Sequence, residues 1–326
     1  FFKFFNSFTP VVSMYYLLRI MMKQKYEMNM NSHPFRFIDA HHHLWDLEAC
    51  DYPWLMAKGE QRFFGDPSPI QKNYLVSDFL NESAQYCPEK SVHIQVGTSK
   101  HDSLKETQWL QQQSPVPNAI VAFCDLSAEN YQQQIDAHKA YSKVKGVRQI
   151  IGRHADEDSK HGSHTLLVNA NWRKAMVYLT EQGLSFDLQM IPPQIDAVYK
   201  ALQTIPNVKI ALCHGGSPWD QSSSGLDSWQ AGLKKLSTLP NVCCKVSGLG
   251  MFNSHWRDQD LASLIERIID TFGPEKTMFG SNFPVDKLYR SYDNYWDCYR
   301  SAVKQYSCLE QHQMFYQTAS NFYQMD

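Results

Sequence analysis

The sequence lacks a strong net charge, because its 31 lysine and arginine residues nearly balance 33 aspartate and glutamate residues. This balance gives no electrostatic reason to expect binding to nucleic acid or to an anionic membrane. A long uninterrupted hydrophobic run is missing as well, so the sequence predicts no membrane span. These absences argue against a nucleic-acid-binding protein and against a membrane protein, so we look for a site that binds a small molecule.

The CxxC motif is also missing, since none of the eight cysteines has another at that spacing. Four of them, Cys124, Cys213, Cys243 and Cys244, lie in apolar strand-like runs, where a reduced cysteine behaves as a small hydrophobic residue. This usage indicates a reducing compartment, and we expect a cytoplasmic location.

Linkers, repeats and low-complexity segments are absent between residues 34 and 326, so we expect a single domain over this range. Residues 1–33 differ, because their apolar stretch is interrupted by polar residues and by Pro10. We expect this segment to be an N-terminal extension, either disordered or produced by an over-called start, with the natural beginning at Met28 or Met30.

Eight short apolar or β-branched runs follow residue 34, and longer amphipathic stretches lie between several of them. Gly183 and Gly273 follow two of these stretches, where helices commonly end. Eight such units predict the α/β class and a single-domain (β/α)8 TIM barrel. The alternative is a doubly wound open sheet, but its glycine-rich phosphate turn is missing after the first run. The expected strands are 35–40, 91–96, 119–124, 146–151, 184–189, 208–213, 242–246 and 277–280.

The first run leads into Asp39, Ala40 and three consecutive histidines, His41, His42 and His43. Alternate side chains of a strand share a face, so His41 and His43 should point one way and His42 the other. Two imidazoles aimed at one point could hold a metal, or they could polarise and protonate a substrate oxygen. A chance run of loop histidines is the competing interpretation.

Polar residues stand at the ends of other expected strands. Because barrel enzymes carry their chemistry at the C-terminal strand ends, these residues are candidates for one site. Each also has a structural interpretation: His93 could be a satisfied interior residue, Arg148 could form an ion pair, and Lys245 could merely pair with a carboxylate. The candidates are His93, Gln95, Arg148, Asp187, His214, Lys245 and Asn282.

A long loop, 44–79, follows the first strand and shows no sustained helical period. Its Trp45 and Trp54 could line a pocket for a ring-shaped substrate, or they could merely cap the barrel. Several other histidines, His138 and His255 among them, lie in polar segments and are expected to be solvated.

From residue 35 to the end, the sequence, with its histidine run and its polar strand-end residues, resembles the amidohydrolase superfamily. The likeness is closest to its amidohydrolase-2 branch, which includes sugar-acid lactonases and 2-pyrone-4,6-dicarboxylate lactonase. The resemblance implies a hydrolase acting on carboxylic ester bonds, which opens a lactone with an activated water. The segments that carry it are 37–46, 52–55, 145–148, 184–189, 214–216, 245–249 and 278–285.

The resemblance also implies roles for individual residues. His41 and His43 would be the pair from the first strand, and His214 would be the histidine from the sixth. Position 282 usually holds the aspartate that activates water, whereas this chain has Asn282, and an amide cannot take a proton near neutral pH.

Without that aspartate, we expect His214 or Asp187 to activate the water. The lactone carbonyl would be polarised by His41, His43 or Arg148, and Asn282 would orient the water or bind the substrate. Gln95, Arg148, Asp187, Trp45 and Trp54 are the expected substrate-binding residues.

No cofactor is expected, because the strand-8 carboxylate is missing. The alternative is one Zn²⁺ held by His41, His43 and His214. Two other functions stay open, a metal-dependent decarboxylase of the same superfamily and a catalytically impaired binding barrel in which Asn282 has replaced the base. The expected partner is a small-molecule substrate, and a homo-oligomer is left open.

Overall fold

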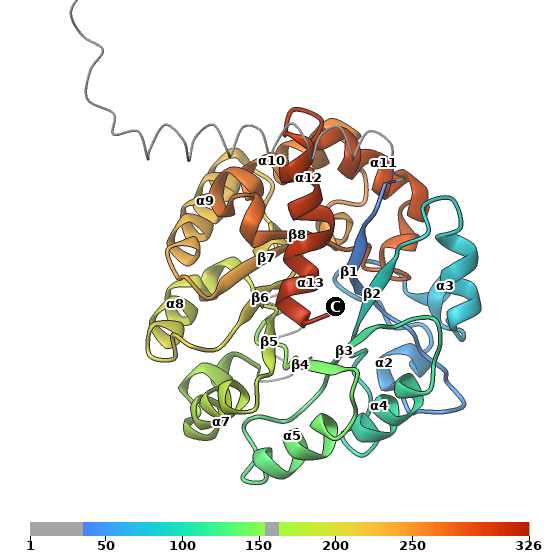
Figure 1. Ribbon diagram of the computed structural model, residues 1–326, viewed down its shortest axis with the longest axis vertical. Coiled ribbons are helices and arrows are strands. Elements are labelled where there is room, and N and C mark those ends of the chain that lie inside the picture. The colour runs from blue at the N-terminus through green and yellow to red at the C-terminus, as the bar shows by residue number, and fades with distance from the viewer. Residues whose placement is uncertain (1–34, 154–162, 326) are drawn as a thin grey trace, which may run out of the picture.

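The computed structural model describes residues 35–153 and 163–325. Its eight strands form one sheet in the order β1 to β8, and each neighbouring pair in that order is parallel. The first and last strands also meet, where Asn282 N donates to His41 O at 2.7 Å and His43 N donates to Phe283 O at 2.7 Å. The sheet therefore forms a nearly closed barrel (Figure 1). The strands are β1 (Ile38–His42), β2 (Lys90–Ile94), β3 (Ala119–Ala122), β4 (Val144–Val147), β5 (Ser185–Leu188), β6 (Ile210–Leu212), β7 (Val242–Val246) and β8 (Thr277–Phe279).

Helices follow the strands and surround the barrel (Figure 1). Asn169, Ser222 and Ser291 accept hydrogen bonds from backbone N–H groups in the first turns of three of them, which fixes where α7, α9 and α11 begin. The described helices are α2 (Pro53–Met56), α3 (Val76–Glu82), α4 (Ser103–Gln111), α5 (Tyr131–Lys139), α7 (Ala170–Glu181), α8 (Ile195–Gln203), α9 (Ser223–Ser237), α10 (Asp258–Phe272), α11 (Tyr292–Ala302), α12 (Cys308–His312) and α13 (Thr318–Tyr323). The prediction of a (β/α)8 TIM barrel is confirmed, and the open-sheet alternative is wrong.

Two strands, β1 and β4, are shifted furthest from their predicted positions. β1 begins at Ile38 rather than at residue 35, and the preceding Phe35 and Phe37 pack their rings against Phe315 and Trp296. It then continues through His42, so His41 lies inside the strand. β4 spans Val144–Val147 rather than 146–151, which leaves Arg148 directly after its last residue.

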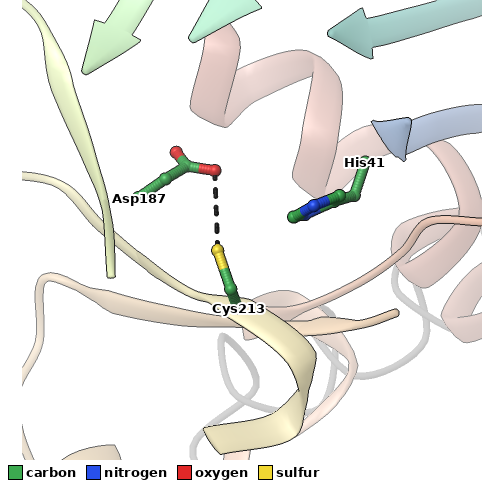
Figure 2. A group of neighbouring side chains, drawn as sticks. All are labelled: His41, Asp187 and Cys213. Carbon is green, nitrogen blue, oxygen red and sulfur yellow. Dashed lines mark hydrogen bonds between the residues drawn. The ribbon is translucent and has the colours of Figure 1, made fainter. Parts of the chain in front are cut away.

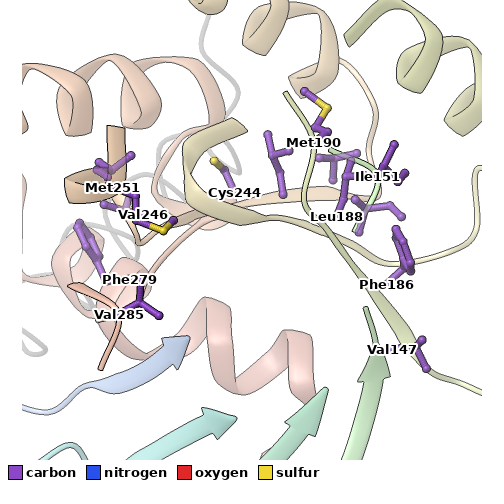
Figure 3. Packing of buried hydrophobic residues seen from close by; sticks show 14 of the residues in the cluster. Val147, Ile151, Phe186, Leu188, Met190, Cys244, Val246, Met251, Phe279 and Val285 are labelled. Atoms are coloured by element: carbon purple, nitrogen blue, oxygen red, sulfur yellow. The ribbon is translucent and has the colours of Figure 1, made fainter. Parts of the chain in front are cut away.

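The larger hydrophobic core lies between the sheet and the surrounding helices. Phe186, Leu188, Val246 and Phe279 are among its fully buried or nearly fully buried members (Figure 3). Burial of such side chains away from water is the main source of stability of this layer. Helices therefore hold the outer face of the strands, and a second cluster fills part of the barrel interior.

The second cluster fills one end of the barrel interior, where α13 packs against Ile38, Val92 and Met278. The C-terminal segment meets the starts of the strands, since Lys90 Nζ donates to Met325 O at 2.8 Å and Lys90 is the first residue of β2. Figure 1 shows α13 and the C-terminus over the barrel centre. The opposite rim, where the strands end, is left for the polar candidates.

The N-terminal extension expected at residues 1–33 lies outside the described residues. No helix in the described part of the chain combines the length and the apolar character that a membrane crossing needs.

Candidate active site

The three consecutive histidines divide between two faces of β1, as the strand alternation predicts. The rings of His41 and His43 lie on the interior side with centroids 5.2 Å apart. His42 points outward, where its ring stacks on Phe79 and its Nε2 lies 2.9 Å from Ser91 Oγ. Two imidazoles of the run therefore face the site, and the third is structural.

Asp39 fixes the junction between β1 and the end of β8. Its Oδ1 accepts from Ser281 N at 2.9 Å and from His41 N at 3.2 Å, and Tyr292 OH donates to Oδ2 at 3.0 Å. Burial raises the pKa of Asp39 to about 6. This carboxylate holds the backbone of His41 beside the segment that carries Asn282.

His214 stands opposite His41 at the end of β6, with ring centroids 4.6 Å apart. Its Nδ1 lies 3.2 Å from Ser247 O and 3.1 Å from Ser247 Oγ. We assign the hydrogen to Nδ1, because the carbonyl oxygen of Ser247 only accepts and the Ser247 hydroxyl can turn to accept as well. Nε2 is then left with its lone pair in the neutral ring. Burial, followed by the positive charge of Arg148, lowers the pKa of His214, and the ring is therefore neutral at neutral pH.

The ring of His214 requires a glycine at position 248. Gly248 has a φ of 62°, and a Cβ added there would lie only 2.4 Å from His214 Nδ1. Any larger residue would displace the imidazole, which explains why a glycine follows Ser247 at the end of β7.

His41 is fully buried, and neither of its ring nitrogens has a hydrogen-bond partner among the described residues. Burial is the largest cause that lowers its pKa, followed by His214 and Lys245. Buried polar atoms are almost always paired in proteins. Two unpaired nitrogens at one position therefore indicate where a ligand, a water or a metal would bind.

His43 and Asn282 form the part of the site nearest to β8. His43 Nδ1 lies 2.7 Å from Ile94 O, and its Nε2 lies 3.3 Å from Asn282 Oδ1. Burial lowers the pKa of His43 to about 3, with the charge of Arg148 as the next cause. Asn282 in turn lies 2.9 Å from Asp286 through its Nδ2. The structure thus brings both predicted residues together.

Arg148 supplies a buried positive charge at the end of β4. Its Nη2 donates to Gln95 O at 2.5 Å and its Nη1 donates to Gln189 Oε1 at 3.1 Å, so amide and carbonyl oxygens hold it rather than a carboxylate. Arg148 Nε and Gln95 Oε1 are buried and have no partner among the described residues. A donor and an acceptor are therefore available to a polar ligand here.

Asp187 lies deeper in the barrel than the histidines. Its Oδ2 accepts from Lys245 Nζ at 2.6 Å, and Tyr323 OH lies 2.8 Å from Oδ1 and 3.0 Å from Oδ2. Lys245 also donates to Ala40 O at 2.8 Å. The structural interpretation of Lys245, pairing with a neighbouring carboxylate, is confirmed. Tyr323 was missed, because no pattern in the sequence indicates that α13 reaches the barrel interior.

Three donor atoms in the described structure could hold one metal ion, and they come from His41, Asp187 and Cys213, all buried (Figure 2). They lie within 4.8 Å of one another, and Cys213 Sγ is 3.9 Å from Asp187 Oδ2. Imidazole, carboxylate and thiolate are all zinc ligands, and the unpaired nitrogens of His41 fit such a role. Burial raises the pKa of Cys213 to about 12, so its thiol would lose a proton on binding.

This donor set shares only His41 with the predicted set of His41, His43 and His214. Cys213 had been interpreted from sequence as a small hydrophobic residue, since it ends an apolar strand. Its position directly before His214, at the rim, was the signal that could have identified it.

Both predicted tryptophans lie between β1 and β2 and use their indole N–H groups internally, but Trp54 belongs to the short helix α2, so the predicted loop over 44–79 is interrupted there. Trp45 is fully buried and donates to Lys72 O at 2.6 Å, and Trp54 is half-buried and donates to Val96 O at 2.8 Å. Their rings contact each other edge to face at 6.0 Å. Binding of a substrate by these rings stays a prediction.

Comparison with known proteins identifies the family to which this chain belongs. A model of the amidohydrolase family matches residues 38–325. An uncharacterized protein of Sinorhizobium fredii, y4mH, is 35% identical over 297 residues, which cover 88% of this chain and 98% of that protein. An L-fucono-1,5-lactonase of Burkholderia multivorans is 25% identical over 267 residues, which cover 78% of this chain and 84% of that enzyme.

A solved amidohydrolase of Burkholderia multivorans with bound zinc has the same fold, with a TM-score of 0.76 and 23% identity over 90% of this chain and 100% of that one. Because the family model spans the barrel from β1 to the last helix, with the histidines of β1 and β6 inside it, this chain belongs to the amidohydrolase family.

Proposed function

We propose that this protein hydrolyses a lactone, a cyclic carboxylic ester, to the corresponding hydroxy acid. The observation that carries the proposal is a pair of facing rings, those of His41 and His214, whose centroids lie 4.6 Å apart beside the buried Arg148. Ser247 fixes His214, and both ring nitrogens of His41 are unpaired within the described part of the chain. The distant relative named L-fucono-1,5-lactonase supports this substrate class. Water activation and charge stabilisation are the two tasks that lactone opening requires.

His214 is the proposed general base. Its Nδ1–H is directed at Ser247 O, so Nε2 has a free lone pair, and burial keeps the ring neutral. A water at Nε2 transfers one proton to it while the water oxygen attacks the carbonyl carbon of the lactone. This role needs no carboxylate at position 282, which is why Asn282 is compatible with turnover.

Arg148 and His41 are the proposed donors to the developing oxyanion. Arg148 is held in place by Gln95 and Gln189 before any substrate binds, and its Nε–H has no partner among the residues that the structure describes. His41 in its neutral form offers one ring N–H. Donors that are fixed in advance in a site without bulk water contribute the most to stabilising such charge.

The tetrahedral intermediate then collapses, and the bond between the carbonyl carbon and the ring oxygen breaks. The leaving oxygen takes the proton from His214 Nε2, which regenerates the base, and the new carboxyl group loses its proton to solvent at neutral pH. Gln95 Oε1 is available to accept from a substrate hydroxyl, and the amide of Asn282 would orient the water.

We also propose one divalent metal ion in place of the metal-free site expected from the sequence. The donor cluster of His41, Asp187 and Cys213 supports it, as does the zinc-bound relative of the same fold. These three residues would hold the ion, and a bound Zn²⁺ lowers the pKa of a coordinated water and polarises a carbonyl. The second ring nitrogen of His41 keeps its hydrogen in that state.

A panel of sugar lactones and pyrones, followed by acid release with a pH indicator, tests the proposal. We expect saturable hydrolysis of at least one lactone. Release of CO2 from aromatic acids without lactone hydrolysis would favour the decarboxylase alternative. Ligand binding without turnover, together with gain of turnover in Asn282→Asp, would favour the impaired binding barrel. Either of these results would overturn the lactonase assignment.

A further inference from the structure

One buried carboxyl group next to the site has no part in the mechanism above. Asp286 is the first residue of a short 3-10 helix, η7 (Asp286–Leu288), and its side chain is fully buried. Its Oδ1 lies 2.9 Å from Asn282 Nδ2, and its backbone N donates to Asn282 O at 3.2 Å. Asp286 is therefore joined to the residue that occupies the usual position of the strand-8 base.

The hydrogen-bond chain from β2 to Asp286 has a direction. Ile94 O can only accept, so His43 Nδ1, 2.7 Å away, carries a hydrogen. In the neutral ring Nε2 is then an acceptor, and the Asn282 atom 3.3 Å from it must be a donor. An amide can present its oxygen or its nitrogen with almost the same shape, and its partners decide which. Here they place the NH2 group toward His43.

This orientation leaves the amide oxygen of Asn282 facing Asp286. A carboxylate only accepts, and two acceptors would then face each other, whereas a carboxylic acid can donate to that oxygen. The neutral acid is thus the form of Asp286 that gives each hydrogen bond from Ile94 to Asp286 one donor and one acceptor. Asp286 Oδ2 has no partner among the described residues.

The surroundings of Asp286 agree with a neutral acid. Burial raises its pKa to about 8, and the groups that act against burial are Asn282, Tyr295 from α11 and the backbone of Gly250, none of which is a cation. Burial raises the pKa of Tyr289 and of Tyr299, and an ionised Asp286 would raise both further. The nearby cations are engaged elsewhere: Lys287 pairs with Glu82, and Arg290 pairs with Asp258 and lies over Trp256.

We propose that Asp286 is a positioning residue, which acts as a carboxylic acid that donates to Asn282 Oδ1 and so turns the Asn282 amide NH2 toward His43 and the site. When Asp286 ionises it must instead accept from Asn282 Nδ2, and the amide oxygen then meets the Nε2 lone pair of His43. In the family a carboxyl group usually stands at position 282, next to the water. In this protein Asn282 occupies that position, and the carboxyl group of Asp286 is hydrogen-bonded behind it. The consequence for turnover rests on the proposed lactone hydrolysis, whereas the protonation itself does not.

The protonation is tested by infrared difference spectroscopy on the purified full chain. The spectrum of the parent minus that of Asp286→Asn should contain the carbonyl band of one protonated carboxylic acid at pH 7, and this band should disappear with a midpoint near pH 8. The difference is needed because burial also raises the pKa of Glu106 to about 8. Asp196→Asn, at an exposed acid, is the matched control and should remove no such band. Absence of the band from the Asp286 difference would overturn the proposal.

The positioning role is tested by the pH dependence of lactone turnover. In the parent, kcat/KM should fall above about pH 8, as Asp286 ionises. Asp286→Asn supplies an NH2 donor in place of the acid, so its fall above pH 8 should disappear. Asp286→Leu supplies no donor, so its kcat/KM at pH 7 should be about 10- to 100-fold below that of the parent. The loss in Asp286→Asn at pH 7 should be smaller.

An identical fall above pH 8 in parent and Asp286→Asn would overturn the positioning role. Thermal melting identifies variants that fail to fold, and Asp286→Asn, which keeps the shape of the side chain, provides the decisive profile. Should no lactone be hydrolysed by any of these proteins, the proposed function fails, while the infrared measurement still decides the state of Asp286.

Discussion

Lys245 Nζ lies 2.6 Å from Asp187 Oδ2 inside the barrel, and both side chains are completely buried. The ion pair is fastened further by Tyr323 from the last helix and by Ala40 O. An Asp187 oxygen lies within 4.8 Å of a His41 ring nitrogen. The site is therefore next to a buried polar cluster that joins β1, β5, β7 and α13.

Loss of this ion pair should destabilise the fold. Lys245→Met leaves the Asp187 carboxylate buried without its cation, which typically costs about 3–5 kcal/mol. Urea unfolding followed by circular dichroism measures the change. Lys235→Met is the matched control, at an ion pair with Asp196 in which the two side chains are 39% and 77% exposed, and it should change the unfolding free energy by less than about 1 kcal/mol. Equal unfolding midpoints for the two variants would show that the buried pair does not support the barrel.

Gly248→Ala should displace His214. The added Cβ would lie 2.4 Å from His214 Nδ1, and a shift of about 1 Å in such a group can lower turnover about 100-fold. Gly183→Ala serves as the control, because Gly183 has a φ of 71° and nothing within 4 Å of the added atom. Both variants carry the backbone strain of a positive φ, and only the first should lose lactone turnover. A comparable loss in both would contradict the steric argument.

The metal proposal predicts a binding pattern that can be read without any activity measurement. After incubation with Zn²⁺ and gel filtration, the parent should retain about one ion per chain, and Cys213→Ala and His41→Ala should each retain much less. Cys87→Ala, at an exposed cysteine, should behave like the parent. Circular dichroism verifies that the variants are folded. Full retention of zinc by Cys213→Ala would exclude that residue from the site.

The sequence predicted those parts of the site that lie at strand ends. The C-terminal ends of parallel barrel strands meet at one rim, so His41, His43, Arg148, His214 and Asn282 could be placed together once the strands were counted. The same reasoning identified the outward-facing His42, because a strand alternates.

The remaining parts depend on tertiary packing. Tyr323 reaches Asp187 because α13 docks into the barrel, and no local pattern specifies that docking. His138 was expected to be solvated and is buried, with its Nδ1 2.8 Å from Thr107 Oγ1, because α5 packs against α4. Asp286 belongs to no pattern that the sequence analysis identified, and only the structure shows it buried against Asn282.

The most direct test of the account is the turnover of the best lactone by His214→Ala, compared with His255→Ala at an exposed histidine. Removal of a general base typically lowers the rate about 100- to 10,000-fold. We predict a loss in this range of kcat/KM for His214→Ala with an unchanged melting temperature, and parent-like turnover for His255→Ala. Undiminished lactone hydrolysis by a folded His214→Ala variant would contradict the assignment of His214 as the base.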